Sequence, residues 1–215
     1  VESDVADYLH KPVLKPFSQS VLFEKKRIFW EICGVNEYAY ENILIPLSKK
    51  NIFQLNALPE ELRVESQSME WMTNDQFFSR TFQEKNSRRI RLNFLSATAF
   101  RSQESYVFTP RSDLILQSIV NKYDAFMEQS ISNDESFQQI LDNLAVNFYD
   151  LRSVKYKIAE IYVPGFIGKV EYYVRGPQQL VNLVNYMFQF ASFSGIGIKT
   201  SLGMGNVKVE GGDTD

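Results

Sequence analysis

A glycine-rich segment near the end of the chain, residues 195–205, combines the residue types that hold an anion through the backbone. Its glycines allow positive φ angles and close approach of the main chain, and successive N–H groups in such a loop form an anion-binding nest. The candidate phosphate-binding residues are Gly195, Gly197, Lys199, Thr200, Ser201, Gly203 and Gly205. A glycine-rich turn that binds nothing fits the same composition equally well, so the loop alone leaves both interpretations open.

A nucleotide-binding P-loop is a rival interpretation that the spacing excludes. That motif reads G-x-x-x-x-G-K-[ST] and lies between a strand and a helix. Here Ile198 separates Gly197 from Lys199, and the segment follows a helical pattern and precedes a short strand. Both the spacing and the context therefore differ from those of a P-loop.

Proton transfer near neutral pH needs a side chain such as His10, which is the only histidine in the chain. The unperturbed pKa of histidine, about 6.5, suits it to act as an acid or a base. With a single cysteine, Cys33, the chain falls short of the three or four ligands of a Cys/His zinc motif. We therefore expect no metal and no cofactor. A histidine near a helix end is also common as a cap or a surface residue.

Charge is distributed unevenly, and the distribution bears on the class of ligand. The net charge of the whole chain is −3, whereas a general nucleic-acid binder is usually basic. Between residues 150 and 210, however, 7 Lys/Arg stand against 4 Asp/Glu. Lys155 and Lys157 alternate on a predicted strand, where they could contact phosphates or simply face solvent. A nucleic-acid contact would thus come from a local patch in the last third.

We expect a cytoplasmic protein without membrane contact. The chain contains no run of 18 apolar residues and no basic-then-apolar leader at its start. A lone cysteine also fits a reducing compartment.

Hydrophobic periodicity divides the chain into two series of elements. The first series is predicted to hold strands at 20–23 and 27–35, an amphipathic helix at 37–50 that Pro46 bends or ends, and strands at 52–58 and 62–72. The second is predicted to hold strands at 88–94 and 106–108, helices at 110–129 and 134–144, strands at 148–159 and 161–175, a helix after Gly176-Pro177, and a strand at 206–210.

These series predict an α+β protein with two tandem ferredoxin-like, RRM-like domains, residues 1–86 and 87–215. The second follows the order βαββαβ. The first shows ββαβ behind a fragment of helix, and so lacks its first strand and part of its first helix. We therefore expect that residues precede Val1 in the natural protein.

The glycine-rich segment resembles the C-terminal signature of the RAMP superfamily of CRISPR-associated proteins, G-x-G-x-K-T-S-x-G-x-G after an amphipathic helix. More closely, the chain resembles the family of endoribonucleases that cut CRISPR precursor RNA within its repeats. The resemblance spans almost the whole sequence. Its other carriers are Tyr8-Leu9-His10, Lys15-Pro16-Phe17-Ser18, Arg91-Leu92-Asn93-Phe94 with Thr98, Phe100 and Pro110, residues 163–168, and Arg175-Gly176-Pro177.

The resemblance implies two ferredoxin-like domains and metal-independent RNA cleavage. The RNA 2′-OH attacks the scissile phosphate, which gives one fragment with a 5′-hydroxyl and one with a 2′,3′-cyclic phosphate or 3′-phosphate. His10 would act as general base or acid, and Lys15 would stabilise the transition state. A tyrosine that the family carries earlier in its first helix would precede Val1 and is absent from this sequence.

The expected partner is the CRISPR precursor repeat RNA, with CRISPR effector subunits as further partners and a homodimer left open. The main alternative is a non-catalytic RNA-binding RAMP subunit of a CRISPR effector complex, which would keep the glycine-rich loop and make no cut. A nucleotide-handling enzyme is a third hypothesis, and it would have to bind ATP or GTP.

Overall fold

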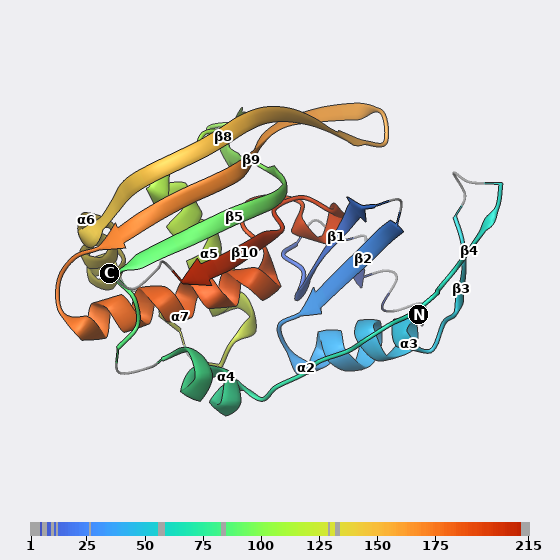
Figure 1. Ribbon diagram of the computed structural model, residues 1–215, viewed down its shortest axis with the longest axis horizontal. Helices are drawn as coiled ribbons and strands as arrows, with labels where there is room; N and C mark the ends of the chain where they lie inside the picture. Colours follow the sequence, from blue (N-terminus) through green and yellow to red (C-terminus); the bar gives the residue numbers. More distant parts are fainter. Residues whose placement is uncertain are drawn as a thin grey trace.

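The protein mixes strands and helices throughout, which confirms the α+β class (Figure 1). The computed structural model describes residues 5–211 apart from residues 6, 7, 10, 12, 26, 56–58, 83, 84, 129, 132 and 133. Within these residues, no helix is long and apolar enough to cross a membrane.

The second half of the chain is built on a four-stranded antiparallel sheet in the order β10-β5-β9-β8. Its strands are β5 (Arg89–Thr98), β8 (Leu144–Ile158), β9 (Ile161–Val174) and β10 (Val207–Gly211). The helices are α5 (Ser112–Phe126), α6 (Asp134–Asn143) and α7 (Gln178–Ser194). In order along the chain these elements read βαββαβ once α5 and α6 are taken together. The ferredoxin-like prediction for this half is therefore confirmed.

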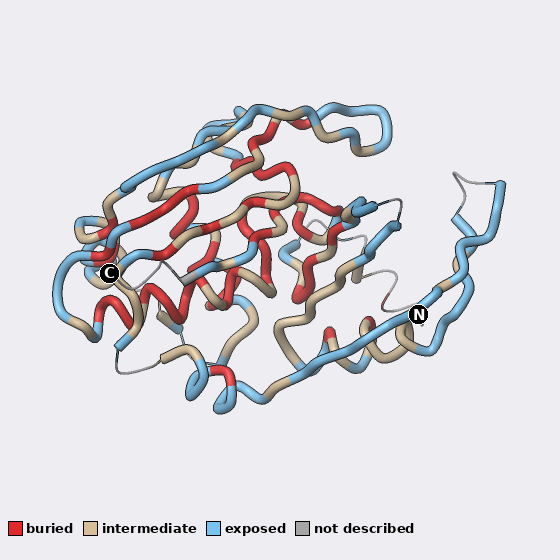
Figure 2. Tube along the Cα trace, in the orientation of Figure 1, coloured by how far each residue is buried: buried red, intermediate tan, exposed pale blue. Residues whose placement is uncertain are grey.

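Alternation along β5 explains how the sheet meets its helices. Ile90, Leu92 and Phe94 are buried against α5 and α7, while the residues between them lie on the other face of the sheet. The helix α7 begins directly after Pro177, as predicted, and buries Leu180, Val184 and Met187 among other residues. Figure 2 shows the buried core between the sheet and α7.

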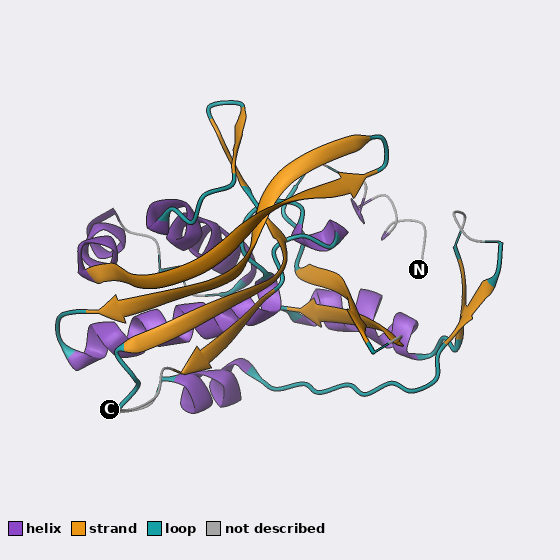
Figure 3. Cartoon of the chain, turned by 45° about the horizontal axis from the view of Figure 1, so that its top comes forward, coloured by secondary structure: helices purple, strands orange, loops and turns teal. Residues whose placement is uncertain are grey.

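Two hairpins extend from this sheet (Figure 3). Strands β8 and β9 pair with each other out to Ile158 and Ile161, whereas β5 pairs with β9 only as far as Phe166. The remainder of β8 and β9 forms an arm beyond the sheet. The second hairpin, β6 (Phe100–Ser102) and β7 (Ser105–Val107), lies between β5 and α5 in the chain.

The first half begins with an antiparallel hairpin of β1 (Phe17–Glu24) and β2 (Arg27–Gly34). A helical segment follows, made of α2 (Glu37–Ala39), the π-helical turn η1 (Tyr40–Leu44) and α3 (Ile45–Ser48). Proline has no N–H to donate, and here the Ile45 N–H reaches back to Tyr40 in a widened turn just before Pro46. The predicted bend is thus a π-helical turn.

The strand predictions at 52–58 and 62–72 are largely wrong. Among the described residues of these two segments, the structure holds only β3 (Ile52–Gln54) and β4 (Glu61–Arg63), which pair with each other in a sheet separate from β1 and β2. Residues 65–71 are exposed, Val64 and Met72 are half-buried, and none of these residues lies in a strand (Figure 2). Apolar alternation favours a strand only where another strand pairs with it, and the sequence pattern does not say whether one does.

The short helix α4 (Asn74–Thr81) was not predicted. It starts in a capping box, because the Thr73 side chain accepts the Gln76 N–H and the Gln76 side chain accepts the Thr73 N–H. The pattern T-x-x-Q was the available sequence signal. The boundary between residues 86 and 87 stays a prediction; β5 begins shortly after it, at Arg89.

Candidate RNA-binding loop and catalytic segment

The glycine-rich loop, residues 195–205, joins α7 to β10 through the short helix η2 (Thr200–Leu202) and lies between the two halves of the chain. From the first half, Gln19 on β1 donates its side-chain N–H to the Ser201 carbonyl at 2.6 Å. From the second half, the Tyr156 hydroxyl on β8 donates to the Leu202 carbonyl at 3.0 Å. Residues far apart in sequence therefore hold the tip of the loop from both sides.

The glycines of this loop are needed for its shape. Gly195, Gly197, Gly203 and Gly205 all have positive φ angles. A Cβ on Gly205 would overlap the Ile196 carbonyl oxygen, and one on Gly197 would overlap the Ala99 carbonyl oxygen. Main-chain hydrogen bonds of 2.9 Å from Ile198 to Ala99 and from Gly205 to Ala97 fasten the loop to the end of β5. The glycines thus bring two backbones into contact.

Only part of the predicted phosphate-binding set is open to a ligand. Gly195, Gly203, Gly205 and Thr200 are buried, and a Cβ on Gly195 would lie 2.8 Å from the Thr200 methyl group. Lys199 and Ser201 are half-buried. In the described part of the chain, the N–H groups of residues 199–201 have no acceptor. Three unpaired N–H donors therefore lie at this turn, where Lys199 has a φ of 56°, and two of them belong to the half-buried Lys199 and Ser201.

Lys155 and Lys157 are both exposed on the β8–β9 arm, but they do not join the loop. The residues beside and between them, Val154, Tyr156 and Ile158, pack toward the cluster that contains Met204 of the loop. Because side chains alternate along a strand, the two lysines point to the opposite side. The structure thus separates them from the other predicted phosphate contacts.

Lys15 precedes β1 and is partly buried. Its ammonium donates to the Tyr8 carbonyl and to the Lys11 carbonyl, the latter at 2.9 Å, and stands 4.4 Å from the centre of the Tyr8 ring. Burial, with a smaller effect from Lys11, lowers the pKa of this ammonium. The two accepting residues flank His10 in the sequence; His10 itself lies outside the described residues. The Lys15 ammonium is thus held by two carbonyls whose residues lie on either side of the predicted catalytic histidine in the sequence.

Cys33 is half-buried on β2, near the contact between the two halves. Burial raises the pKa of its thiol to about 12, so the reactive thiolate is not populated near neutral pH. Cys33 is thus a packed residue rather than a reactive thiol.

An arginine on the sheet face opposite α7 is paired with two carboxylates. The Arg91 guanidinium lies 2.8 Å from the Glu171 carboxylate and 3.7 Å from that of Glu210. Hydrogen bonds from Asn147 and then Arg91 hold the pKa of Glu171 below its usual value. Arg89, Lys169 and Lys208 share this face by strand register, so the two carboxylates offset only part of its positive charge.

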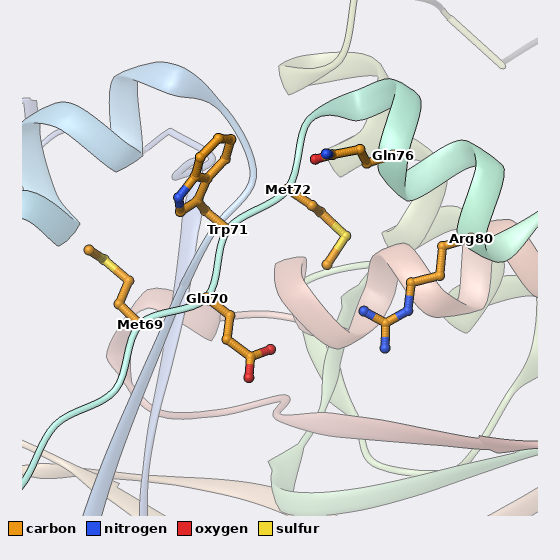
Figure 4. A pocket seen from close by; sticks show the side chains of 6 residues that line it. All are labelled: Met69, Glu70, Trp71, Met72, Gln76 and Arg80. Carbon is orange, nitrogen blue, oxygen red and sulfur yellow. The ribbon is translucent and has the colours of Figure 1, made fainter.

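An open hollow of about 510 Å³ lies beside the exposed segment before α4 (Figure 4). Glu70 projects toward it from that segment, and Arg80 projects from α4. Its lining residues are Met69, Glu70, Trp71, Met72, Gln76 and Arg80. These include none of the predicted catalytic or phosphate-binding residues.

Removing the Tyr156 hydroxyl tests how tightly the loop is held. We expect Tyr156→Phe to lower the free energy of unfolding by about 1 kcal/mol, the net value of one hydrogen bond. Urea denaturation measures the change. Tyr162→Phe is the matched control, because Tyr162 is 61% exposed on the neighbouring strand. Equal effects of the two substitutions would contradict a holding role for Tyr156.

A family model for the CRISPR-associated endoribonuclease Cas6 matches residues 92–207. The chain belongs to the Cas6 family. The matched span runs from β5 to the first residue of β10 and contains the whole glycine-rich loop. The family resemblance seen in the sequence is therefore confirmed.

Two curated Cas6 proteins and one solved structure extend this similarity along the chain. A CRISPR-associated endoribonuclease Cas6 of Streptococcus thermophilus is 29% identical over 98% of this chain and 86% of its own length. A Cas6 of Mycobacterium tuberculosis is also 29% identical over 98% of this chain, and 69% of its own length is matched. The structure of a Cas6 product complex has a TM-score of 0.81 at 24% identity, covering 96% of this chain and 87% of that one. The fold is thus the Cas6 fold.

Sequence reasoning missed the residues that hold the loop of this Cas6 protein. Gln19 and Tyr156 contact the loop across 182 and 46 residues of chain, respectively. Neither belongs to a motif. Tyr156 lies between Lys155 and Lys157, so strand alternation places its side chain on the face opposite to the two lysines. Alternation does not show which residue it contacts there.

Proposed function

We propose that this protein cleaves CRISPR precursor transcripts within their repeats to release guide RNAs. The observation that carries the proposal is the match to the Cas6 endoribonuclease family over a span that includes the glycine-rich loop. Relatives named as Cas6 endoribonucleases align over 98% of the chain, and the similar solved structures include a product complex and a substrate-mimic complex of Cas6.

The proposed chemistry uses the nucleophile that RNA itself supplies. His10 removes the proton of the 2′-OH or protonates the departing 5′-oxygen. Lys15 stabilises the negative charge that builds on the phosphorane. The position of the Lys15 ammonium, bonded to carbonyls on either side of His10 in the sequence, supports this pairing.

The proposed RNA grip is the turn of residues 199–201. Lys199 supplies a cation, and the unpaired N–H groups of the half-buried Lys199 and Ser201 supply donors for phosphate oxygens. Lys155 and Lys157 contact a different stretch of the backbone, because they project from the other side of the β8–β9 arm. The buried glycines shape the loop without contacting RNA.

Chelation tests whether the cut depends on a metal. We expect labelled repeat RNA to be cleaved at the same rate with and without EDTA, because the groups proposed for proton transfer and charge stabilisation, His10 and Lys15, are protein side chains. The products should carry a 5′-hydroxyl and a 2′,3′-cyclic phosphate or 3′-phosphate, which end-specific phosphatase and kinase treatment distinguishes. Loss of cleavage in EDTA would contradict the proposed metal-independent mechanism. Tight repeat binding without any cleavage would instead favour the non-catalytic RAMP subunit.

A further inference from the structure

Helix α5 contacts the first part of the glycine-rich loop through two polar side chains that are one turn apart. Ser118 accepts the Gly197 N–H at 2.7 Å. Lys122 donates to the Gly195 carbonyl at 2.9 Å and to the Ser194 carbonyl at 3.3 Å. Residues four apart lie on the same face of a helix, so both side chains approach the loop from α5 together.

Lys122 is an unusual residue for its position. It is 4% exposed, and the interface between α5 and α7 around it is apolar or aromatic, with Tyr123 and Phe190 packed edge to face. Burial lowers the pKa of the ammonium to about 7, because a charged group is less stable away from water. A leucine or methionine would fill the same space without that cost. The ammonium must therefore be explained by the carbonyls that it contacts.

Those carbonyls lie where α7 ends and the loop begins. The last carbonyls of a helix lack N–H partners and carry partial negative charge, which a cation satisfies. On the other side of the loop, the Gly197 backbone stands against Ala99, so it cannot shift toward β5 without collision. The path of residues 195–197 is thus bounded by α5 on one side and by β5 on the other.

We propose that Ser118 and Lys122 are positioning residues that hold the start of the glycine-rich loop, so that the unpaired N–H groups of Lys199 and Ser201 face the RNA backbone. The RNA part of this proposal rests on the proposed function. The holding part stands on the contacts alone and is testable without RNA.

Hydrogen exchange of the RNA-free protein tests the holding part. The variants are Ser118→Ala, which removes one acceptor, and Lys122→Met, which keeps the apolar stem and removes the ammonium. Peptides covering residues 195–205 should exchange roughly tenfold faster in both variants, because local opening governs exchange. Ser79→Ala on α4 and Lys85→Met, both at exposed positions, are the matched controls and should leave these peptides unchanged.

Binding of repeat RNA tests the consequence. The dissociation constant should rise about threefold to tenfold in each variant, the effect of one lost hydrogen bond. Ser118→Thr keeps the hydroxyl and should bind like the unsubstituted protein. The melting temperature separates a positioning role from a purely stabilising one. Lys122→Met removes a buried cation and should not lower Tm. If Lys122 only stabilised α7, the same substitution would lower Tm.

Three outcomes would overturn the proposal: unchanged exchange in residues 195–205, weaker binding that merely follows a lower Tm, or equal effects in the controls. Faster exchange with weaker RNA binding at unchanged Tm supports it. If the unsubstituted protein binds no repeat RNA, the proposed function fails, and the exchange data still decide whether Ser118 and Lys122 hold the loop.

Discussion

Replacing His10 by alanine is expected to slow cleavage of repeat RNA by roughly 10²–10⁴-fold, the usual contribution of a general acid or base. His10 is the only histidine in the chain, so no second imidazole can take its place. The Lys15 ammonium should keep its carbonyl partners, because both are main-chain groups of other residues. The loss should therefore appear in the rate of the chemical step.

Single-turnover cleavage at saturating protein measures that step. The dissociation constant for repeat RNA and the melting temperature of His10→Ala should stay close to those of the unsubstituted protein. His10→Gln, which keeps a polar side chain but cannot transfer a proton, should be as slow as His10→Ala. Lys50→Ala, at an exposed position after α3, is the control that should cleave normally. An unchanged rate in His10→Ala would remove this residue from the proposed site.

Replacing Gly205 by alanine is expected to cost about 3 kcal/mol of folding stability and to abolish tight RNA binding. Gly205 has a φ of 73°, which L side chains rarely adopt. The added methyl group would also overlap the Ile196 carbonyl oxygen. Because Ile196 is buried, this carbonyl cannot move away to make room. To relieve the collision, the loop must leave Ala97, to which the Gly205 N–H donates at 2.9 Å.

Urea denaturation and RNA binding measure the two effects separately. Leu202→Ala is the matched control, because Leu202 belongs to the same loop and its side chain is 50% exposed. Its stability should change by no more than about 0.5 kcal/mol, as for other surface substitutions. A Gly205→Ala protein as stable as Leu202→Ala would show that the loop tolerates a different path, and would contradict the structural role given to the glycine.

The second half of the chain follows from local sequence signals. Apolar residues recur along α7 at helical spacing from Leu180 onward, and Pro177 stands where the helix begins. The strands predicted at 148–159 and 161–175 are also present, as β8 and β9. These signals suffice because each element buries a face of its own and pairs with a neighbour in the chain. The capping box at Thr73, which begins α4, is an equally local signal.

The segments at 52–58 and 62–72 show where such signals stop. Leu62 and Val64 alternate as in a strand, yet only a three-residue piece there is paired, and with β3 rather than with β2. A strand is defined by its partner, and the choice of partner is a long-range property of the fold. The same limit applies to Gln19 and Tyr156.

By itself, the sequence determined the family and the position of the glycine-rich loop, because motifs of contiguous residues carry them. The pair His10 and Lys15 stays a prediction from such motifs. Only the tertiary structure decided which loop residues are open. It buries Thr200 and the glycines at positions 195, 203 and 205, and among the described residues it gives the N–H groups of the half-buried Lys199 and Ser201 no acceptor. It also turns Lys155 and Lys157 away from the loop. The exposure of a residue and the direction of its side chain depend on what packs against it, and that packing comes from distant elements such as β1, β5 and α5.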